Sequence, residues 1–260
     1  MPAPPWLTER PVAHRGFHDR ERGRIENTLP ASEAAIARGF AIECDLQLTR
    51  DGVPIVFHDD TLDRLTTATG PVGACTLDEI RTLRLRDTEA TIPTLDELLA
   101  LIAGRVPLFT EFKSRFDRDR RLEAAAAPLL AAYRGPLAVM SFDPDSVRML
   151  RTLLPGVPRG LVADGYTDPE WDFIPPLRRL ALRHLAAVPE LEPDFLAFCV
   201  GDLPSDAPLR VHGEGVPLLA WTVRTAADRA TAARYADQII FEGFDPAATG
   251  TASAESAGTR

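Results

Sequence analysis

Short apolar runs alternate with longer stretches rich in Ala, Leu and Arg along this chain of 260 residues, and this rhythm constrains the fold most strongly. It is typical of repeated βα units whose strands form one parallel sheet. The runs expected to form strands are residues 11–16, 40–46, 106–113, 136–142, 158–163, 194–200, 217–223 and 237–242. Eight strands with helical crossovers predict an α/β protein with a (β/α)8 TIM barrel, a fold that often holds about 250 residues in one domain.

Helices are expected in the stretches between these strands. In residues 29–39, Pro30 suits the first helical turn and Gly39 suits the C-terminal stop. The regular spacing breaks once, because about 60 residues separate the second expected strand from the third. The other expected helices are residues 120–133, 143–154, 176–186 and 225–235.

Charge and cysteine content exclude several classes of protein. The formal net charge of −9 and the pI near 5.1 disfavour broad binding to nucleic acid or to anionic membranes. Cys44, Cys75 and Cys199 are odd in number and lie in apolar contexts, which indicates buried, reduced thiols and not a disulfide framework. The N-terminus has no basic start followed by an apolar run, and no run reaches about 18 apolar residues. We therefore expect a cytoplasmic protein without stable membrane insertion.

Three carboxylates fall near the ends of two expected strands. Glu43 and Asp45 are two residues apart, so on a strand they project from the same face. Glu111 ends the next expected strand, and neighbouring strands lie about 4.8 Å apart, so its side chain can reach the same point. Two like charges on an interior face require a positive partner between them. An all-oxygen set without clustered Cys or His predicts a hard divalent cation, Mg²⁺ or Ca²⁺.

A tight hairpin is expected directly after these acids. The pair Asp51 and Gly52 is a strong signal for a two-residue turn. If these two residues form the loop, the returning strand places His58 directly opposite Asp45. The turn would then bring an imidazole to the carboxylates.

The first expected strand ends in a second group of reactive side chains. His14 is suited to proton transfer, Arg15 to a bidentate phosphate contact and Gly16 to close backbone approach. Like the acids, these residues lie at the C-terminal end of a strand, where barrel enzymes carry their chemistry.

Taken together, these motifs resemble the glycerophosphodiester phosphodiesterases from about residue 11 to residue 246. The segments that carry the resemblance are AHRG, ENT, ECDLQLTRDGVPIVFHDDTLDRLT, IPTLDELL, EFK, SFDPDSVRML and WTVR. The resemblance implies a barrel enzyme that uses a divalent cation to hydrolyse glycerophosphodiesters to sn-glycerol 3-phosphate and an alcohol. It implies that Glu43, Asp45 and Glu111 are metal ligands, and that His14 and His58 are the acid–base pair.

The same resemblance assigns the substrate contacts. Arg15 and Lys113 would contact the phosphate, Asn27 would support the site, and Trp221 would pack against the glycerol. It also implies an insertion at about residues 59–95, which matches the irregular gap. The expected organisation is one domain, residues 1–246, and a disordered tail at 247–260.

Two departures from the family pattern are visible, and two alternatives stay open. The usual PENT reads IENT here, and the last strand ends in Phe241 and Glu242 where Thr-Asp is common.

The first alternative is a related barrel phosphodiesterase for lysophospholipids or inositol phosphodiesters, although the 7% aromatic content gives a lipid-binding lip little support. The second is an inactive barrel that binds a phosphate compound. For the enzyme, we favour His14 as the base and His58 as the acid; the order of the two, the alcohol, the cation and the oligomeric state stay open.

Overall fold

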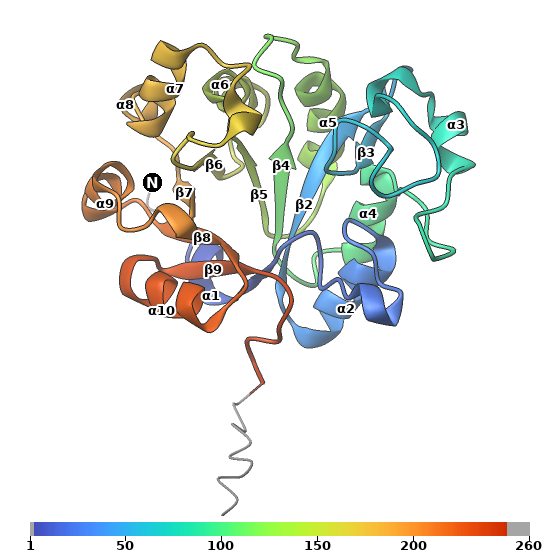
Figure 1. Cartoon of the computed structure of the whole chain (residues 1–260), viewed down its shortest axis with the longest axis horizontal. Helices are drawn as coiled ribbons and strands as arrows, with labels where there is room; N and C mark the ends of the chain where they lie inside the picture. Colours follow the sequence, from blue (N-terminus) through green and yellow to red (C-terminus); the bar gives the residue numbers. More distant parts are fainter. Residues whose placement is uncertain (1–2, 249–260) are drawn as a thin grey trace, which may run out of the picture.

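Eight parallel strands close into a ring in the computed structural model, which describes residues 3–248 (Figure 1). β1 pairs with both β2 and β9, and this closes the barrel. The ring contains β1 (Val12–Ala13), β2 (Ala41–Leu48), β4 (Leu108–Phe112), β5 (Leu137–Ser141), β6 (Arg159–Ala163), β7 (Phe195–Cys199), β8 (Leu218–Val223) and β9 (Gln238–Phe241). Each expected run overlaps one of these strands, although β2 extends two residues beyond its run, so the predicted (β/α)8 barrel is confirmed. Residues 249–260 of the predicted disordered tail lie outside the described residues.

Helices surround the barrel and include all five that the sequence predicts (Figure 1). Two further helices of the outer layer, α4 and α9, are not among the predicted ones. None of the helices in residues 3–248 is both long enough and apolar enough to span a membrane. The helices are α1 (Trp6–Glu9), α2 (Leu29–Arg38), α3 (Leu77–Arg81), α4 (Leu95–Ile102), α5 (Arg121–Ala132), α6 (Pro144–Leu153), α7 (Pro176–Arg183), α8 (Val188–Leu191), α9 (Asp206–Gly213) and α10 (Ala226–Tyr235), with short 3-10 turns at Arg20–Arg22, Val72–Ala74, Pro169–Trp171 and Val200–Asp202.

Local signals set the bounds of α2 as the sequence predicts. The Thr28 hydroxyl accepts a hydrogen bond from the backbone N–H of Ala31, and Pro30 lies in the first turn. Gly39 ends the helix in the left-handed conformation, with φ of 70°. Helix α2 therefore begins and ends where its own capping residues require.

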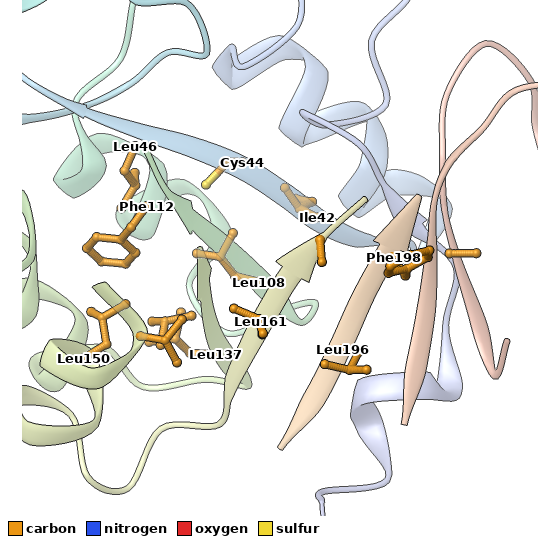
Figure 2. Packing of buried hydrophobic residues seen from close by; sticks show 14 of the residues in the cluster. Ile42, Cys44, Leu46, Leu108, Phe112, Leu137, Leu150, Leu161, Leu196 and Phe198 are labelled. Carbon is orange, nitrogen blue, oxygen red and sulfur yellow. The ribbon is translucent and has the colours of Figure 1, made fainter. Parts of the chain in front are cut away.

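Alternation along β2 places its acids inside the barrel. Ile42, Cys44 and Leu46 lie in the apolar cluster between the strands and the surrounding helices (Figure 2). Successive strand residues point to opposite faces, so Glu43 and Asp45 project into the interior. Both carboxylates are 1% exposed, which makes their charge partners decisive for stability.

Aromatic rings fill the interior on the N-terminal side of the strands. Phe109 packs against Phe195 with ring centroids 5.7 Å apart, and Trp6 of α1 packs against Phe109 at 5.9 Å. A Cβ at Gly160 would lie 2.3 Å from the Phe195 ring, so only glycine fits at that position. The filled interior leaves the carboxyl ends of the strands as the place for a site.

The close approach at Gly160 gives a stability prediction. Gly160→Ala is expected to destabilise the protein by about 1–3 kcal/mol, because the buried Phe195 ring must shift within a filled interior. Urea denaturation followed by circular dichroism measures this change. The matched control is Gly156→Ala, since a Cβ at Gly156 meets no atom within 4 Å. Equal stability of the two variants would contradict the interior packing described here.

The hairpin after β2 differs from its prediction by one position. The antiparallel strand β3 (Pro54–Val56) pairs with β2 in a register that does not put His58 opposite Asp45, so this prediction is wrong. The loop contains three residues, 50–52, because Thr49 donates its backbone N–H to Val53 O and accepts the Val53 N–H on its hydroxyl. His58 lies beyond the end of β3, and contacts in the following loop position it instead.

Between β3 and α4 the chain forms a small apolar cluster of its own, separate from the barrel interior. The predicted insertion, residues 59–95, contributes most of its members and includes α3. Its buried residues are Ile25, Ile55, Phe57, Leu62, Val72, Ile80, Leu85 and Ile92. This cluster holds the loop that carries His58 against the barrel.

Candidate active site

A pocket of about 450 Å³ lies at the carboxyl ends of the strands. Its charged residues come mainly from the ends of β1, β2 and β4, and its aromatic residues mainly from segments after β4, β5 and β6 and from β8. The charged group includes His14, Arg15, Glu43, His58, Glu111 and Lys113, and the aromatic group is Phe112, Phe116, Phe142, Trp171, Phe173 and Trp221. The pocket therefore combines a region for an anionic group with an apolar region.

The three predicted carboxylates meet at one point. Glu43, Asp45 and Glu111 each offer an oxygen, and these oxygens all lie within 4.8 Å of one another. The parallel register of β2 and β4 places Asp45 beside Glu111, as the spacing predicts. All three side chains are buried, so the group is held by the barrel and not by solvent.

Asp45 is surrounded by donors that stabilise its charge. Lys113 Nζ lies 2.7 Å from Asp45 Oδ1 and 2.5 Å from Glu111 Oε1, so it supplies the positive partner that the sequence requires. Asn27 Nδ2 donates to Asp45 Oδ2 at 2.8 Å. Burial alone would raise the pKa of Asp45, but Lys113, His58 and Arg15 lower that pKa well below its usual range.

Glu43 lies in the opposite electrostatic situation. Its Oε2 accepts the backbone N–H of Arg15 at 2.9 Å, whereas its buried Oε1 has no hydrogen-bond partner within residues 3–248. Burial, followed by repulsion from Asp45 and Glu111, raises the pKa of Glu43 well above its usual range. An unsatisfied buried oxygen beside two further carboxylates fits a hard divalent cation.

His14 is oriented by a carboxylate from the far end of the chain. Its Nδ1 lies 2.7 Å from Glu242 Oε2, and Arg224 Nε donates to the other oxygen of Glu242 at 2.6 Å. An ionised carboxylate only accepts, so Nδ1 carries the proton and Nε2 presents its lone pair. That Nε2 lies 3.9 Å from Glu43 Oε2. Burial is the main cause that lowers the pKa of His14 to about 4, and the nearby charge of Arg15 lowers it further, although the hydrogen bond to Glu242 raises it. The imidazole is therefore neutral near pH 7.

His58 is oriented by its neighbour in sequence. Its Nδ1 lies 2.7 Å from Asp59 Oδ1, and Arg64 binds Asp59 and also Glu26. Glu26 in turn accepts from Arg15 NH1 at 2.6 Å. A connected set of ion pairs therefore runs from Arg15 to the imidazole of His58. The structure brings both predicted histidines to the same pocket, although the hairpin register that suggested this is wrong.

The sequence did not identify three of these supporting residues. Glu242 was visible only as a departure from the family pattern, although its place at the end of the last barrel strand is a usable signal. Asp59 has no predicted role, although its position directly after His58 could have suggested the contact. Glu26 belongs to the ENT segment, but its contacts could not be predicted, because they depend on two arginines that the fold brings to it.

Comparison with known proteins agrees with the geometry of the pocket. The sequence matches the glycerophosphoryl diester phosphodiesterase family over residues 14–244. A probable glycerophosphodiester phosphodiesterase 1 of Mycobacterium tuberculosis is 32% identical over 175 residues, which cover 58% of this chain and 63% of that protein. Glycerophosphodiester phosphodiesterase 1 of Bos taurus is 42% identical over 152 residues, which cover 54% of this chain and 44% of that protein.

A solved structure shares the whole fold. The phosphodiesterase of Oleispira antarctica, determined in complex with its product sn-glycerol 3-phosphate, superposes with a TM-score of 0.75 at 23% identity and covers 91% of this chain and 93% of that one. The chain spans less than two thirds of the length of the two curated relatives described above. The family match nevertheless includes all of the predicted site residues, from His14 to Trp221. The protein therefore belongs to the glycerophosphoryl diester phosphodiesterase family.

Proposed function

We propose that the protein hydrolyses glycerophosphodiesters to sn-glycerol 3-phosphate and an alcohol, with a divalent cation and two histidines. The observation that carries this proposal is the convergence of Glu43, Asp45 and Glu111 in the pocket that also contains His14 and His58. A binding protein for a phosphate compound would need the charges but not two imidazoles, each oriented by a carboxylate. Membership of the family supports the same reaction.

The carboxylates would hold the cation, which we propose is Mg²⁺ or Ca²⁺. Hard cations prefer oxygen ligands, and the three side chains offer only oxygens. When bound, such an ion supplies charge neutralisation at the phosphate and polarises its P–O bonds. Lys113 already satisfies Asp45 and Glu111, so Glu43 is the ligand whose environment most requires the ion.

The histidines would move the protons of the reaction. His14 is neutral near pH 7 and presents the Nε2 lone pair, so we assign it as the base that accepts a proton from water or from the glycerol 2-hydroxyl. His58 would donate a proton to the leaving oxygen. Arg15 and Lys113 would contact the phosphate oxygens, Asn27 would hold Asp45 in place, and Trp221 would pack against the glycerol.

Glu242 is expected to be a positioning residue for His14. Glu242→Gln should lower kcat by about 10- to 100-fold with little change in KM, because the amide can rotate its NH2 group toward Nδ1 and favour the wrong tautomer. Steady-state kinetics measure this split. Glu242→Asp keeps a carboxylate at the family's Thr-Asp position and should retain more activity than Glu242→Gln.

The control for this prediction is Glu214→Gln, which makes the same change in an exposed ion pair with Arg210 on the outer side of α9. It should leave kcat unchanged. Equal kcat values for Glu242→Gln and the control would remove Glu242 from the mechanism.

One assay tests the proposed function directly. The purified protein is incubated with glycerophosphocholine and with Mg²⁺, with Ca²⁺ or with a chelator, and sn-glycerol 3-phosphate and choline are quantified. The proposal predicts equal amounts of both products in the presence of a cation and almost none in the chelator. Binding of the diester without turnover under all conditions would contradict it and favour the inactive barrel.

We also propose a cytoplasmic location. Cys44, Cys75 and Cys199 form no disulfide within the described part of the chain, which supports a reducing compartment. An intrachain disulfide already present in the protein, isolated from its native cells with free thiols blocked and without added oxidant, would contradict this proposal.

A further inference from the structure

A second cavity, of about 480 Å³, lies outside the barrel between the start of α6 and helix α7 (Figure 1). We call it the α6–α7 cavity, and none of the residues that line it also lines the active-site pocket. Leu161 of β6 lines it from the strand face that packs toward the helices (Figure 2). The volume lies within the range of roughly 300–1,000 Å³ that is typical of sites for small molecules.

The wall of the α6–α7 cavity is mostly aliphatic. Pro144, Leu161, Leu182 and Leu185 line it, together with three alanines between residues 181 and 187. The three leucines are buried members of the apolar cluster that surrounds the barrel. Two of the alanines, at positions 181 and 186, are exposed, so the cavity opens to solvent on that side. The shape and the wall therefore suit a ligand with an aliphatic part.

One hydroxyl group in this aliphatic wall lacks a partner. Tyr166 is only 5% exposed, and its hydroxyl makes no hydrogen bond to any residue from 3 to 248, although its oxygen is not fully enclosed by protein atoms. Tyr166 lines the α6–α7 cavity and not the active-site pocket. Burial, followed by the charge of Asp164, raises the pKa of Tyr166 well above its usual range, so the hydroxyl keeps its proton and can donate it. Buried polar groups are almost always hydrogen-bonded, so this hydroxyl indicates an acceptor that the chain itself does not supply.

The lining charges leave one guanidinium group uncompensated. Arg118 is exposed at the cavity and forms no ion pair in the described part of the chain. The other two charged lining residues have partners: Arg178 lies 3.5 Å from Asp143 and 3.6 Å from Asp145, and Asp145 also pairs with Arg148. One unpaired positive charge beside one free hydroxyl donor matches a monoanionic acceptor group.

The backbone fixes both donors in an unfavourable conformation. Arg118, Tyr166 and Leu185 all line the cavity, and their φ angles are 68°, 50° and 54°. Residues with a side chain rarely adopt this left-handed region, because Cβ approaches the following carbonyl oxygen. Such conformations persist where the surrounding structure imposes them, and they are concentrated at functional sites.

We propose that the α6–α7 cavity is a second binding site of the protein and that it binds small aliphatic carboxylates. The carboxylate accepts the hydrogen bond of the Tyr166 hydroxyl and pairs with Arg118. The aliphatic chain lies against Leu161, Leu182 and Leu185. This inference goes beyond the proposed hydrolysis and does not depend on it.

The α6–α7 cavity lies behind the aromatic side of the active-site pocket. The ring centroid of Tyr166 is 6.4 Å from that of Phe142 and 5.0 Å from that of Trp171. The latter two rings line the active-site pocket. A carboxylate in the cavity therefore contacts the back of this aromatic wall without entering the active site.

Nuclear magnetic resonance of the protein with isotope-labelled tyrosine rings tests the location of the site. The chain contains three tyrosines, Tyr133, Tyr166 and Tyr235, and of these only Tyr166 lines the cavity. Tyr166→Phe identifies the Tyr166 signal by its loss. Octanoate, the probe, should shift this signal in a saturable way and leave the signals of the other two tyrosines in place.

Isothermal titration calorimetry with octanoate tests the chemistry of the site. Tyr166→Phe should weaken binding about tenfold or more, because it removes a hydrogen bond to a charged group. Arg118→Gln should weaken it by about two- to fivefold, because this charge is exposed. The matched controls are Tyr235→Phe and Arg234→Gln on α10, which lie away from the cavity and should leave the affinity unchanged.

Two further probes and one further variant separate the parts of the proposal. Acetate lacks the chain and octylammonium reverses the charge, so each should bind at least about tenfold more weakly than octanoate. Ala181→Phe adds a ring at an exposed position of α7 that lines the cavity, and it should abolish the shift of the Tyr166 signal.

Four results would each overturn the inference. They are no saturable shift of the Tyr166 signal, unchanged octanoate affinity in Tyr166→Phe and Arg118→Gln, equal affinity for octylammonium, and a shift that persists in Ala181→Phe. The last result would place octanoate in the active-site pocket instead. None of these measurements involves catalysis, so their failure would leave the proposed hydrolysis untouched, and a failure of that hydrolysis would leave this site untouched.

Discussion

His14→Ala is expected to lower kcat by about 10²- to 10⁴-fold while the protein remains folded, and His58→Ala should have an effect of the same order. Each change removes one of the two groups that we assign to proton transfer. Each change also removes the imidazole partner of a carboxylate, Glu242 or Asp59. Each carboxylate keeps an arginine partner, Arg224 or Arg64, so the fold is expected to survive. Steady-state kinetics on glycerophosphocholine measure the effect, and circular dichroism with thermal melting checks the fold.

The control for both histidine variants is His184→Ala. His184 is exposed at the end of α7, outside the pocket, and should be replaced without loss of activity. Full activity in His14→Ala or in His58→Ala would remove that histidine from the mechanism.

Loss of the cation site should have the second large effect. Glu43→Gln is expected to lower cation-dependent activity by at least about 100-fold, because it removes the ligand whose second oxygen lacks a partner in the protein. A chelator should have the same effect on the wild-type protein, and added Mg²⁺ or Ca²⁺ should reverse it. The matched control is Glu33→Gln on α2, which is exposed and distant from the pocket.

The same variant should stabilise the protein when no cation is present. The pKa of Glu43 is raised in the folded state, so folding disfavours its ionised form, and the cost appears as the pH rises above about 4.5, where the unfolded state ionises. Glu43→Gln should therefore raise Tm at pH 7 in a chelator and leave it unchanged near pH 3.5. Excess cation, in contrast, should raise the Tm of the wild-type protein. At a cation concentration one hundred times Kd, the free energy of unfolding should rise by about 2.7 kcal/mol. A lower Tm for Glu43→Gln at pH 7 in the chelator would contradict the electrostatic account.

Most of the barrel could be predicted because its strands are buried on both faces. In the sequence such strands are apolar runs, and each of the eight runs overlaps one strand. The hairpin register could not be predicted from the Asp51-Gly52 pair, because the choice between two and three loop residues depends on the bonds of Thr49 to Val53. One extra loop residue shifts the pairing by one position.

In the site, too, the positions fixed by backbone geometry could be predicted, and those that depend on particular contacts could not. Glu43, Asp45 and Glu111 could be placed together because strand alternation and the spacing of parallel strands are fixed by backbone geometry. The partner of His14 could not be predicted, because Glu242 is 228 residues away in the sequence and reaches His14 only when β9 closes the barrel beside β1.

The aromatic side of the pocket could not be predicted for a related reason. Phe142, Trp171 and Trp221 follow or lie in different strands, and no periodic pattern connects them. The overall aromatic content of 7% conceals the fact that the fold gathers these rings at one pocket. Composition alone therefore does not show where in the fold the aromatic residues gather.

The central claim is that three carboxylates bind one divalent cation beside two histidines, and isothermal titration calorimetry tests it most directly. The account predicts that the wild-type protein binds one Mg²⁺ or Ca²⁺ per chain and that Glu43→Gln, Asp45→Asn and Glu111→Gln each weaken this binding at least about tenfold. Unchanged cation affinity in all three variants, or full hydrolysis of glycerophosphocholine by the wild-type protein in a chelator, would contradict it.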